Sequence, residues 1–371
     1  MKILLGGIPL GCDNIGDEAI LAGVAGMLKA GLPGVELAVA TADPATGPLL
    51  GVGTVPPYGF AGVPADGFAD AVRAHDAYVW CGATGLSDYP HTGLDLLEAA
   101  QRAGVPAYVW GVGMDDELNP VFFRAAGRRR ALLAATGLLG IYERRLRARL
   151  ARRIARILPR CRGVWLRDPQ SAEMLARTGY PGAGVTADSA LLLAPPPRPA
   201  AASPRHRLGL CISTQRQVSD LDGVRRLADA VRAEGGEVLG IPMNPKTDRG
   251  LLSRLGVDCM EGDTPDAVMA AAASCDVVVS SRLHLLILAA MAGTPGIGVA
   301  RGSKIANWLA NFGETPAGSV ADCDWGAVLA RVREAFRSPG DWPVRRDVAF
   351  ARLRARFDAA RADFLARLAA P

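Results

Sequence analysis

The sequence has 371 residues, half of them hydrophobic and 21% charged, which excludes a disordered chain and, at roughly 100–200 residues per domain, favours two domains. The formal net charge is only +5, and nearly all basic residues are arginines in an Ala- and Gly-rich chain. We therefore interpret the arginines as compositional bias and expect no nucleic-acid partner. The seven scattered cysteines form no CxxC pair, which argues against a disulfide framework and a structural zinc site.

The first apolar run gives no sign of a targeting segment. Gly6, Gly7 and Pro9 interrupt it before the core of a signal peptide could form. No apolar stretch reaches the ~20 uncharged residues of a membrane span. We expect a cytoplasmic protein.

Short apolar runs then alternate with helical patterns, which is typical of parallel sheets covered by helices on both faces. The first half predicts strands at residues 2–8, 35–41, 77–81, 105–112 and 164–167, with helices at 17–29, 92–103 and from about 169. After a proline-rich stretch, the second half predicts strands at 208–213, 237–241, 276–280 and 296–300, with helices at 223–233, 263–273, 282–292 and 345–369. The predicted fold class is α/β, with two Rossmann-like domains.

The proline-rich stretch sets the predicted domain boundaries, because it can continue neither a helix nor a central strand. Residues 1–194 form the predicted first domain, 195–205 the linker and 206–344 the second domain. The helix in 345–371 is expected to cross back to the first domain, as such helices often do in two-domain folds of this type.

An arginine-rich helical segment covers residues 144–156. Leu146, Leu150, Ile154 and Ile157 fall on one stripe, with arginines around it. A basic amphipathic helix can lie on an anionic membrane, here the inner face, as a peripheral contact. The alternative, a surface helix whose stripe packs on the sheet, is favoured because arginine is abundant throughout the chain.

The first candidate site is the loop after the first strand, residues 11–19 (GCDNIGDEA). It leads into a helix N-terminus, where unpaired N–H groups can bind a ligand. Asp17 and Glu18 stand where a phosphate would want no acids, so Asn14, Gly16 and these two residues favour binding of sugar hydroxyls or acid–base chemistry. In the alternative interpretation, Asp17 caps the helix and Glu18 offsets its dipole.

The second candidate site is the strand-to-helix turn at residues 280–284 (SSRLH). Ligands of open α/β sheets bind beyond the carboxyl ends of strands, which is where this turn is predicted. Ser281 and Arg282 could bind an anion, since arginine suits carboxylate and phosphate groups. His284 is a natural proton donor near neutral pH.

Three further residues follow predicted strands and could add to the same site: Arg216, Lys304 and His91. The pair Arg167 and Asp168, and Asp188, could equally be ion pairs that hold loops.

Together these segments resemble the polysaccharide pyruvyl transferase family. The resemblance rests on the loop G-x-x-N-x-G-D-E-A at 11–19, on R-D-x-x-S-x-x-x-L at 167–175, and on S-x-R-L-H at 280–284 followed by Gly293 and Pro295. A lysine in a later loop matches Lys304. The order and spacing agree over nearly the whole chain, with one departure: residues 81–85 read CGATG, where the family tends to have a glycine cluster.

The resemblance implies a GT-B-like fold with a central cleft and transfer of pyruvate from phosphoenolpyruvate to two hydroxyls of a saccharide, forming a ketal in polysaccharide biosynthesis. It implies that Arg282 and His284 bind phosphoenolpyruvate with Arg216, while Asn14, Asp17 and Glu18 face a saccharide or lipid-linked saccharide acceptor on the opposite domain. The chemistry needs no metal and no organic cofactor. In this hypothesis His284 donates the proton, and Asp17 or Glu18 is the base.

Two other functions stay open. A GT-B glycosyltransferase using a nucleotide-sugar would share the fold, and the altered 81–85 loop is compatible with a divergent family member acting on a small natural-product acceptor. The sequence does not specify the acceptor, the hydroxyl positions, the ketal stereochemistry or the oligomeric state.

Overall fold

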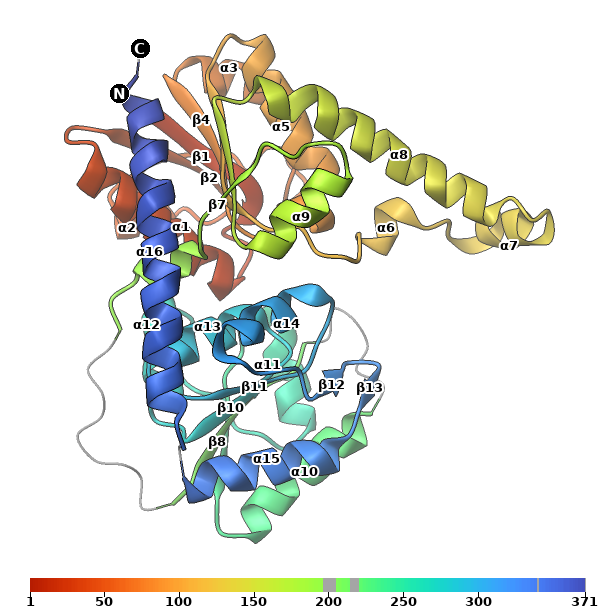
Figure 1. Cartoon of the computed structure of the whole chain (residues 1–371), viewed down its shortest axis with the longest axis vertical. Coiled ribbons are helices and arrows are strands. Elements are labelled where there is room, and N and C mark those ends of the chain that lie inside the picture. Colours follow the sequence, from red (N-terminus) through yellow and green to blue (C-terminus); the bar gives the residue numbers. More distant parts are fainter. Residues whose placement is uncertain (196–204, 214–219, 339, 371) are drawn as a thin grey trace. The chain divides into compact units, whose positions relative to one another are not determined.

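The computed structural model describes residues 1–195, 205–213, 220–338 and 340–370 (Figure 1). The chain forms two compact units. Unit 1 contains residues 1–12, 24–188 and 356–371, and unit 2 contains residues 13–23 and 189–355. The units therefore differ from the predicted domains 1–194 and 206–344 at residues 13–23, 189–194 and in the last helix. The predicted linker, 195–205, falls almost entirely outside the described residues.

Unit 1 is built on a seven-stranded parallel sheet in the order β3-β2-β1-β4-β5-β6-β7. Its strands are β1 (Lys2–Leu10), β2 (Glu36–Thr41), β3 (Gly53–Val55), β4 (Ala77–Cys81), β5 (Ala107–Val112), β6 (Gly163–Leu166) and β7 (Gly184–Val185). Its helices are α2 (Thr46–Leu50), α3 (Phe68–Arg73), α4 (Gly85–Asp88), α5 (Pro90–Arg102), α6 (Pro120–Phe123), α7 (Gly127–Ala135), α8 (Leu139–Ile157) and α9 (Pro169–Arg177). Helix α1 (Ile15–Gly31) begins in unit 2 and continues in unit 1.

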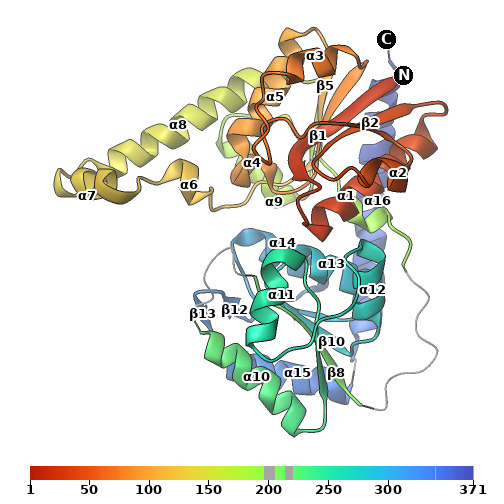
Figure 2. The same cartoon turned by 180° about the vertical axis from the view of Figure 1, so that it is seen from behind.

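Helices cover both faces of this sheet, as Figures 1 and 2 show from opposite sides. Trp80 on β4 packs under Gly93 of α5, which has no side chain to displace the indole. Trp110 on β5 faces the other way and stacks on Phe364 of α16 (Trp342–Ala369), with ring centroids 4.5 Å apart. Both tryptophans are fully buried. Burial on both faces explains why these strands are apolar throughout.

Unit 2 has a four-stranded parallel sheet in the order β11-β10-β8-β9. Its strands are β8 (Arg207–Cys211), β9 (Glu237–Gly240), β10 (Val277–Ser280) and β11 (Gly296–Gly298), with a small hairpin of β12 (Gly318–Ser319) and β13 (Asp322–Cys323). Its helices are α10 (Leu221–Ala233), α11 (Pro245–Arg254), α12 (Pro265–Ala273), α13 (Leu283–Met291), α14 (Ser303–Leu309) and α15 (Trp325–Arg337). The first part of α16, to residue 355, belongs to this unit. Two parallel sheets with helices confirm the predicted fold class.

Helix α11 is absent from the predicted elements. Its sequence, PKTDRGLLSR, is too polar for a clear apolar stripe. Local chemistry starts it instead: the Asn244 side chain accepts a hydrogen bond from the Thr247 N–H at 3.2 Å, and Pro245 occupies the first turn. This helix matters for the site because it carries Asp248.

Candidate functional site

The turn at residues 280–284 lies where the strand order of unit 2 reverses. Strand β8 has β10 on one side and β9 on the other, so the loops after β8 and β10 diverge at this edge. A ligand crevice is expected at such a switch point, beyond the carboxyl ends of the strands. The Ser281 hydroxyl joins the two loops by accepting a hydrogen bond from the Ser213 N–H at 2.8 Å. Both serines are fully buried.

The two sequence motifs meet at this edge. Residues 13–23 belong to unit 2, and Gly16 lies directly against the imidazole of His284. A β-carbon at position 16 would overlap the ring and lie 2.8 Å from Cβ of His284. The loop is further fixed by a hydrogen bond from the Ile15 N–H to the Met243 carbonyl at 3.0 Å. The expectation that this loop and His284 lie on opposite domains therefore differs from the structure, which groups them in one compact unit.

The acidic side of the site is organised by Asn14. Its carbonyl accepts hydrogen bonds from the N–H groups of Asp17 and Glu18, and its side chain donates to Asp17 Oδ2 at 2.6 Å. Asn14 therefore occupies the cap position that the structural alternative gave to Asp17. Asp17 is buried, with 4% of its surface exposed, whereas Glu18 is partly exposed. The two acids thus differ in access to a ligand.

Arg282 is held in a buried ion pair. Its Nη2 donates to Asp248 Oδ1 at 2.7 Å and its Nε to Oδ2 at 3.2 Å. Asp248 is completely buried and also accepts hydrogen bonds from the N–H groups of Met243 and Asn244. The carboxylate thus fixes the plane of the guanidinium. Sequence reasoning missed Asp248 because it lies on the unpredicted helix α11.

A second cation at the same edge was also missed. Arg301 follows β11, and its Nη1 donates to the Ser213 hydroxyl at 3.2 Å. Its position after a predicted strand is the feature of the sequence that could have identified Arg301 as a site residue. Lys304, which was predicted, stands in the first turn of α14 after Gly302, whose φ of 116° favours glycine. Arg216 lies outside the described residues.

Unit 1 has its own polar cluster at the carboxyl ends of its strands, around Arg167. This arginine is buried, its Nε donates to Asp168 at 3.2 Å, and its Nη1 lies 3.9 Å from Asp188. Burial lowers the pKa of Arg167, but the charges of Asp168, Asp188 and Asp115 outweigh it and raise the pKa above its ordinary value. Gly113 leaves room for the guanidinium, since a β-carbon there would lie 2.6 Å from Nη2. The ion pairs that one of the two interpretations gave Arg167 are present.

His91 lies elsewhere in unit 1, at the start of α5. Its ring stacks on Phe123 of α6, with centroids 5.5 Å apart, and Arg153 of α8 lies 3.4 Å from its Nδ1. Burial and the charge of Arg153 lower the pKa of His91. These neighbours account for a histidine that holds three helices together, and its predicted substrate contact stays a prediction.

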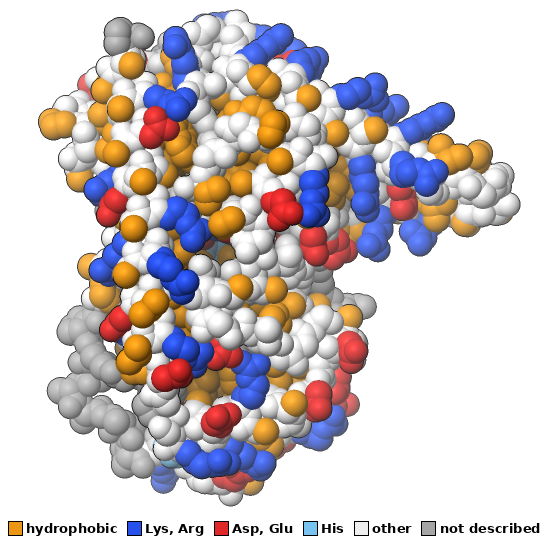
Figure 3. Space-filling model, in the orientation of Figure 1, with side chains coloured by type: hydrophobic (Ala, Val, Ile, Leu, Met, Phe, Trp, Pro, Cys, Tyr) orange, Lys and Arg blue, Asp and Glu red, His pale blue; other side chains and the backbone are white. Residues whose placement is uncertain are grey.

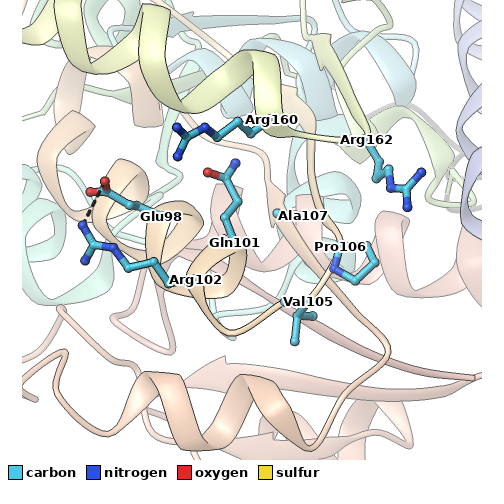
Figure 4. Close-up of a pocket in the computed structure, with 9 residues that line it drawn as sticks. Glu98, Gln101, Arg102, Val105, Pro106, Ala107, Arg160 and Arg162 are labelled. Carbon is cyan, nitrogen blue, oxygen red and sulfur yellow. Dashed lines mark ion pairs between the residues drawn. The ribbon is translucent and has the colours of Figure 1, made fainter.

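One hollow of about 360 Å³ in unit 1 lies away from the edge expected to bind ligands (Figure 4). It is lined by the start of β5 and by Arg160 and Arg162, just before β6. These are the amino ends of the strands, opposite the edge where ligands of such sheets bind.

Within the described ranges, no group of three or more His, Cys, Asp or Glu side chains could hold a metal ion. No helix in the described part of the chain is long and apolar enough to cross a membrane.

Residues 14–303 match the polysaccharide pyruvyl transferase family. The chain belongs to this family. The match begins at Asn14, within the first candidate motif, and includes the whole turn at 280–284. Family membership makes the chain a transferase of polysaccharide modification. No curated protein sequence matches it.

The fold of this family member is shared with several solved structures. A glycosyltransferase from Rickettsia africae has a TM-score of 0.60 at 9% identity, with 100% of this chain and 99% of that chain covered. The UDP-GlcNAc 2-epimerase of Neisseria meningitidis, bound to UDP-GlcNAc, has a TM-score of 0.56 at 13% identity, with 99% of each chain covered. Spinosyn rhamnosyltransferase, complexed with thymidine diphosphate, has a TM-score of 0.53 at 16% identity, covering 97% and 96%. At these identities the likeness shows the GT-B-like fold alone.

Proposed function

We propose that this protein transfers pyruvate from phosphoenolpyruvate to two hydroxyls of a saccharide and closes them into a cyclic ketal. One observation carries the proposal. In unit 2 the imidazole of His284 lies against Gly16, one residue before the acids Asp17 and Glu18, at the edge that also carries Arg282 and Arg301. A proton donor, acids and cations are thus gathered at one sheet edge.

The cations suit the donor substrate. Phosphoenolpyruvate carries a carboxylate and a phosphate, and guanidinium groups bind both well. Arg282, oriented by Asp248, keeps its predicted role together with Ser281 and Lys304, and we add Arg301. Arg216 keeps its predicted role on the strength of the sequence alone.

The reaction balances with no further reactant. His284 protonates the methylene carbon of phosphoenolpyruvate, which leaves C2 cationic. An acceptor hydroxyl attacks C2 and loses its proton to a base; the bond from C2 to the phosphate oxygen breaks; and a second hydroxyl adds to C2, losing its proton in turn. The products are the ketal and inorganic phosphate.

The geometry favours Glu18 over Asp17 as the base. Asp17 is buried and accepts a hydrogen bond from Asn14, which suits a residue that positions the loop. Glu18 is partly exposed on the same helical turn. We assign acceptor binding to Asn14, Gly16 and their neighbours, and the acceptor-side proton transfer to Glu18.

The test is turnover with phosphoenolpyruvate and a panel of saccharide and lipid-linked saccharide acceptors, scored by phosphate release and by the mass of the product. We expect His284→Gln to lower kcat by about 10²–10⁴-fold, the range for a well-placed general acid. His206→Gln is the matched control, because His206 is an exposed histidine of unit 2 at the amino end of β8. Equal turnover of the two variants would refute the role of His284.

Transfer from a nucleotide-sugar is the second candidate, since structures with this fold hold UDP-GlcNAc and thymidine diphosphate. Thermal-shift titration separates the two donors: stabilisation by phosphoenolpyruvate and not by UDP supports our proposal, and the reverse supports the glycosyltransferase. A small natural-product acceptor stays open because of the CGATG loop, where Ala83 has a φ of 55°. Such acceptors belong in the same panel.

A further inference from the structure

A projecting helical hairpin of unit 1 combines strong positive charge with exposed apolar side chains. We define the arm as residues 124–149, which contain α7 and the first half of α8 (Figures 1 and 2). The predicted apolar stripe of 144–156 is largely buried, through Leu150 and Ile154 together with Ile157. That part of α8 therefore packs as a surface helix. The exposed basic and apolar side chains that could contact a membrane lie on the arm.

The charge of this region is one-sided. The arm, residues 124–149, contains eight arginines and a single acid, Glu143, and Arg124 pairs with Glu117 outside the arm at 3.3 Å. Glu143 is already engaged, 3.7 Å from Arg130 and accepting a hydrogen bond from the Ala125 N–H. A ligand of this surface must therefore supply many negative charges.

The end of the arm is apolar. Helix α7 buries none of its residues, and Leu132 is 65% exposed. In the turn and at the start of α8, Leu138 and Ile141 are 48% and 40% exposed. Large aliphatic side chains gathered on one exposed element mark an interaction site rather than ordinary surface. Figure 3 shows the hydrophobic and basic side chains interleaved along the projecting hairpin.

The arm also has internal support for its shape. The guanidinium of Arg129 on α7 lies 4.4 Å from the ring centroid of Tyr142 on α8. This cation–π contact, with the Arg130–Glu143 pair, ties the two helices together. The apolar tip is thus presented by a folded element.

We propose that the arm docks on an anionic lipid bilayer, with its arginines at the headgroup phosphates and Leu132, Leu138 and Ile141 in the acyl boundary. An anionic membrane offers phosphates to the arginines and an acyl region to the exposed aliphatic side chains. A nucleic acid would leave the leucines exposed, and a second copy of this chain would bring the same positive charge to the contact. The inference is independent of the donor substrate, and it fits an acceptor carried on a lipid.

The test is co-sedimentation of the full chain with vesicles of phosphatidylcholine alone or mixed with phosphatidylglycerol. We expect binding to the anionic vesicles and little to the neutral ones. Raising the salt to about 1 M, where the Debye length falls to about 3 Å, should weaken the binding strongly. Equal binding to both vesicle types would overturn the proposal.

Two sets of variants separate charge from insertion. Arg128→Gln, Arg144→Gln and Arg145→Gln together should weaken binding about 100-fold, at roughly fivefold per arginine near the surface. Leu132→Ser, Leu138→Ser and Ile141→Ser together should weaken it at least tenfold and remove the part that survives high salt. Because all six of these side chains are exposed, both sets should melt at the wild-type temperature.

The controls remove the same chemistry elsewhere. Arg225→Gln, Arg226→Gln and Arg254→Gln neutralise three exposed arginines of unit 2, and Leu49→Ser and Val344→Ser remove exposed aliphatic side chains outside the arm. These variants should bind as the wild type does. Arm variants that bind like the controls would overturn the proposal, as would a dimer in solution that the arm variants abolish.

Insertion itself has a direct readout. Leu138→Trp places an indole at the tip, and lipids brominated in the acyl chain should quench it when the arm docks. Quenching beyond that of the wild-type chain supports the proposal. Full binding without added quenching would contradict the placement of the tip in the acyl boundary.

Discussion

Gly16 and His284 stand 268 positions apart in the chain and define each other's environment. The imidazole occupies the space where any side chain at residue 16 would begin. The glycine is thus needed for close approach, although the first turn of a helix usually accepts other residues. Because the two motifs are in contact, a substitution at either residue is expected to disturb the other.

We expect Gly16→Ala to lower stability by about 1–3 kcal/mol, because the new methyl group overpacks against His284. Turnover should fall as well, since the ring must move. Urea unfolding and kcat measure the two effects.

A control and a rescue accompany this variant. Gly26 lies in the same helix with open space around it, so Gly26→Ala should be neutral or stabilising by about 0.5–1 kcal/mol. Adding His284→Ala to Gly16→Ala should recover part of the lost stability, because the ring is gone. Strict additivity in this double-mutant cycle would contradict the contact.

Asp248→Asn should cost about 3 kcal/mol, because it leaves the charge of Arg282 buried without its counter-charge. Asp222→Asn removes one partner of the exposed pair with Arg225 and should change stability by less than about 1 kcal/mol. Chemical denaturation compares them. Similar losses for both variants would show that burial adds nothing to the Arg282 pair.

At the residue scale, candidates could be proposed from the sequence where a motif is local, but not where a contact depends on packing. Asn14, Asp17, Glu18, Arg282 and His284 stand in short motifs that follow strands. Asp248 and Arg301 do not, because a buried ion pair and a bond to Ser213 arise only when distant loops meet. No alternation pattern in the sequence encodes such a meeting.

At the scale of elements, helix α16 has two different anchors. Near its start, the Trp342 indole donates to the Gly293 carbonyl at 3.1 Å in unit 2. Near its end, Phe364 lies among Tyr108, Trp110 and Trp165 of unit 1. The amphipathic pattern predicted the helix but not these partners, because periodicity gives the buried face of a helix and not what covers it.

Phe364→Ala should destabilise unit 1 by about 3–5 kcal/mol, the range for emptying a buried aromatic site. Phe364 is fully buried, so the cavity would be lined by three aromatic rings. Hydrogen exchange of β5 and β6 should report the loss, while exchange in β8 and β10 should change less. Uniform exchange through both units would mean that the helix stabilises them together.

Strand boundaries followed the apolar runs closely, and Ala77–Cys81 was predicted to the residue. Helices in polar sequence fared worse: α11 was missed because its start is encoded by the Asn244 cap rather than by an apolar stripe. The fold class needs only the alternation of apolar runs, which is why it could be predicted.

At the scale of the whole molecule, buried thiols are expected to lower the folding stability at high pH. Burial raises the pKa of Cys161 to about 12 and that of Cys275 to about 12. In the unfolded chain a thiol titrates near 8.5, so between about pH 8.5 and 12 the folded protein binds more protons than the unfolded one. Stability should therefore fall as the pH rises through this window, by about 1.4 kcal/mol per pH unit for each thiol.

Urea-unfolding midpoints from pH 7.5 to 10.5, in the presence of a reductant, test this. The double variant Cys161→Ala and Cys275→Ala should show a shallower decline. A slope identical to that of the wild type would assign the decline to other groups, such as Tyr78, whose pKa burial also raises.

The division into units was the least predictable feature. Composition marks a proline-rich stretch, but it does not show which distant segments a given segment packs against. Residues 13–23 join unit 2 although they follow the first strand of unit 1. The turn into α1 is fixed by Met243 and His284, which lie more than 200 residues away.

The interleaving of the units also has a consequence for biosynthesis. Unit 1 includes residues 356–371, so its sheet is complete on the Trp110 face only after the ribosome has made the segment carrying Phe364. Until then the tryptophans of β5 and β6 remain without this cover while residues 189–355 of unit 2 are synthesised. At ~5–20 residues per second, that delay lasts on the order of ten seconds or more. The nascent chain is thus expected to present an aromatic surface to chaperones for most of its elongation.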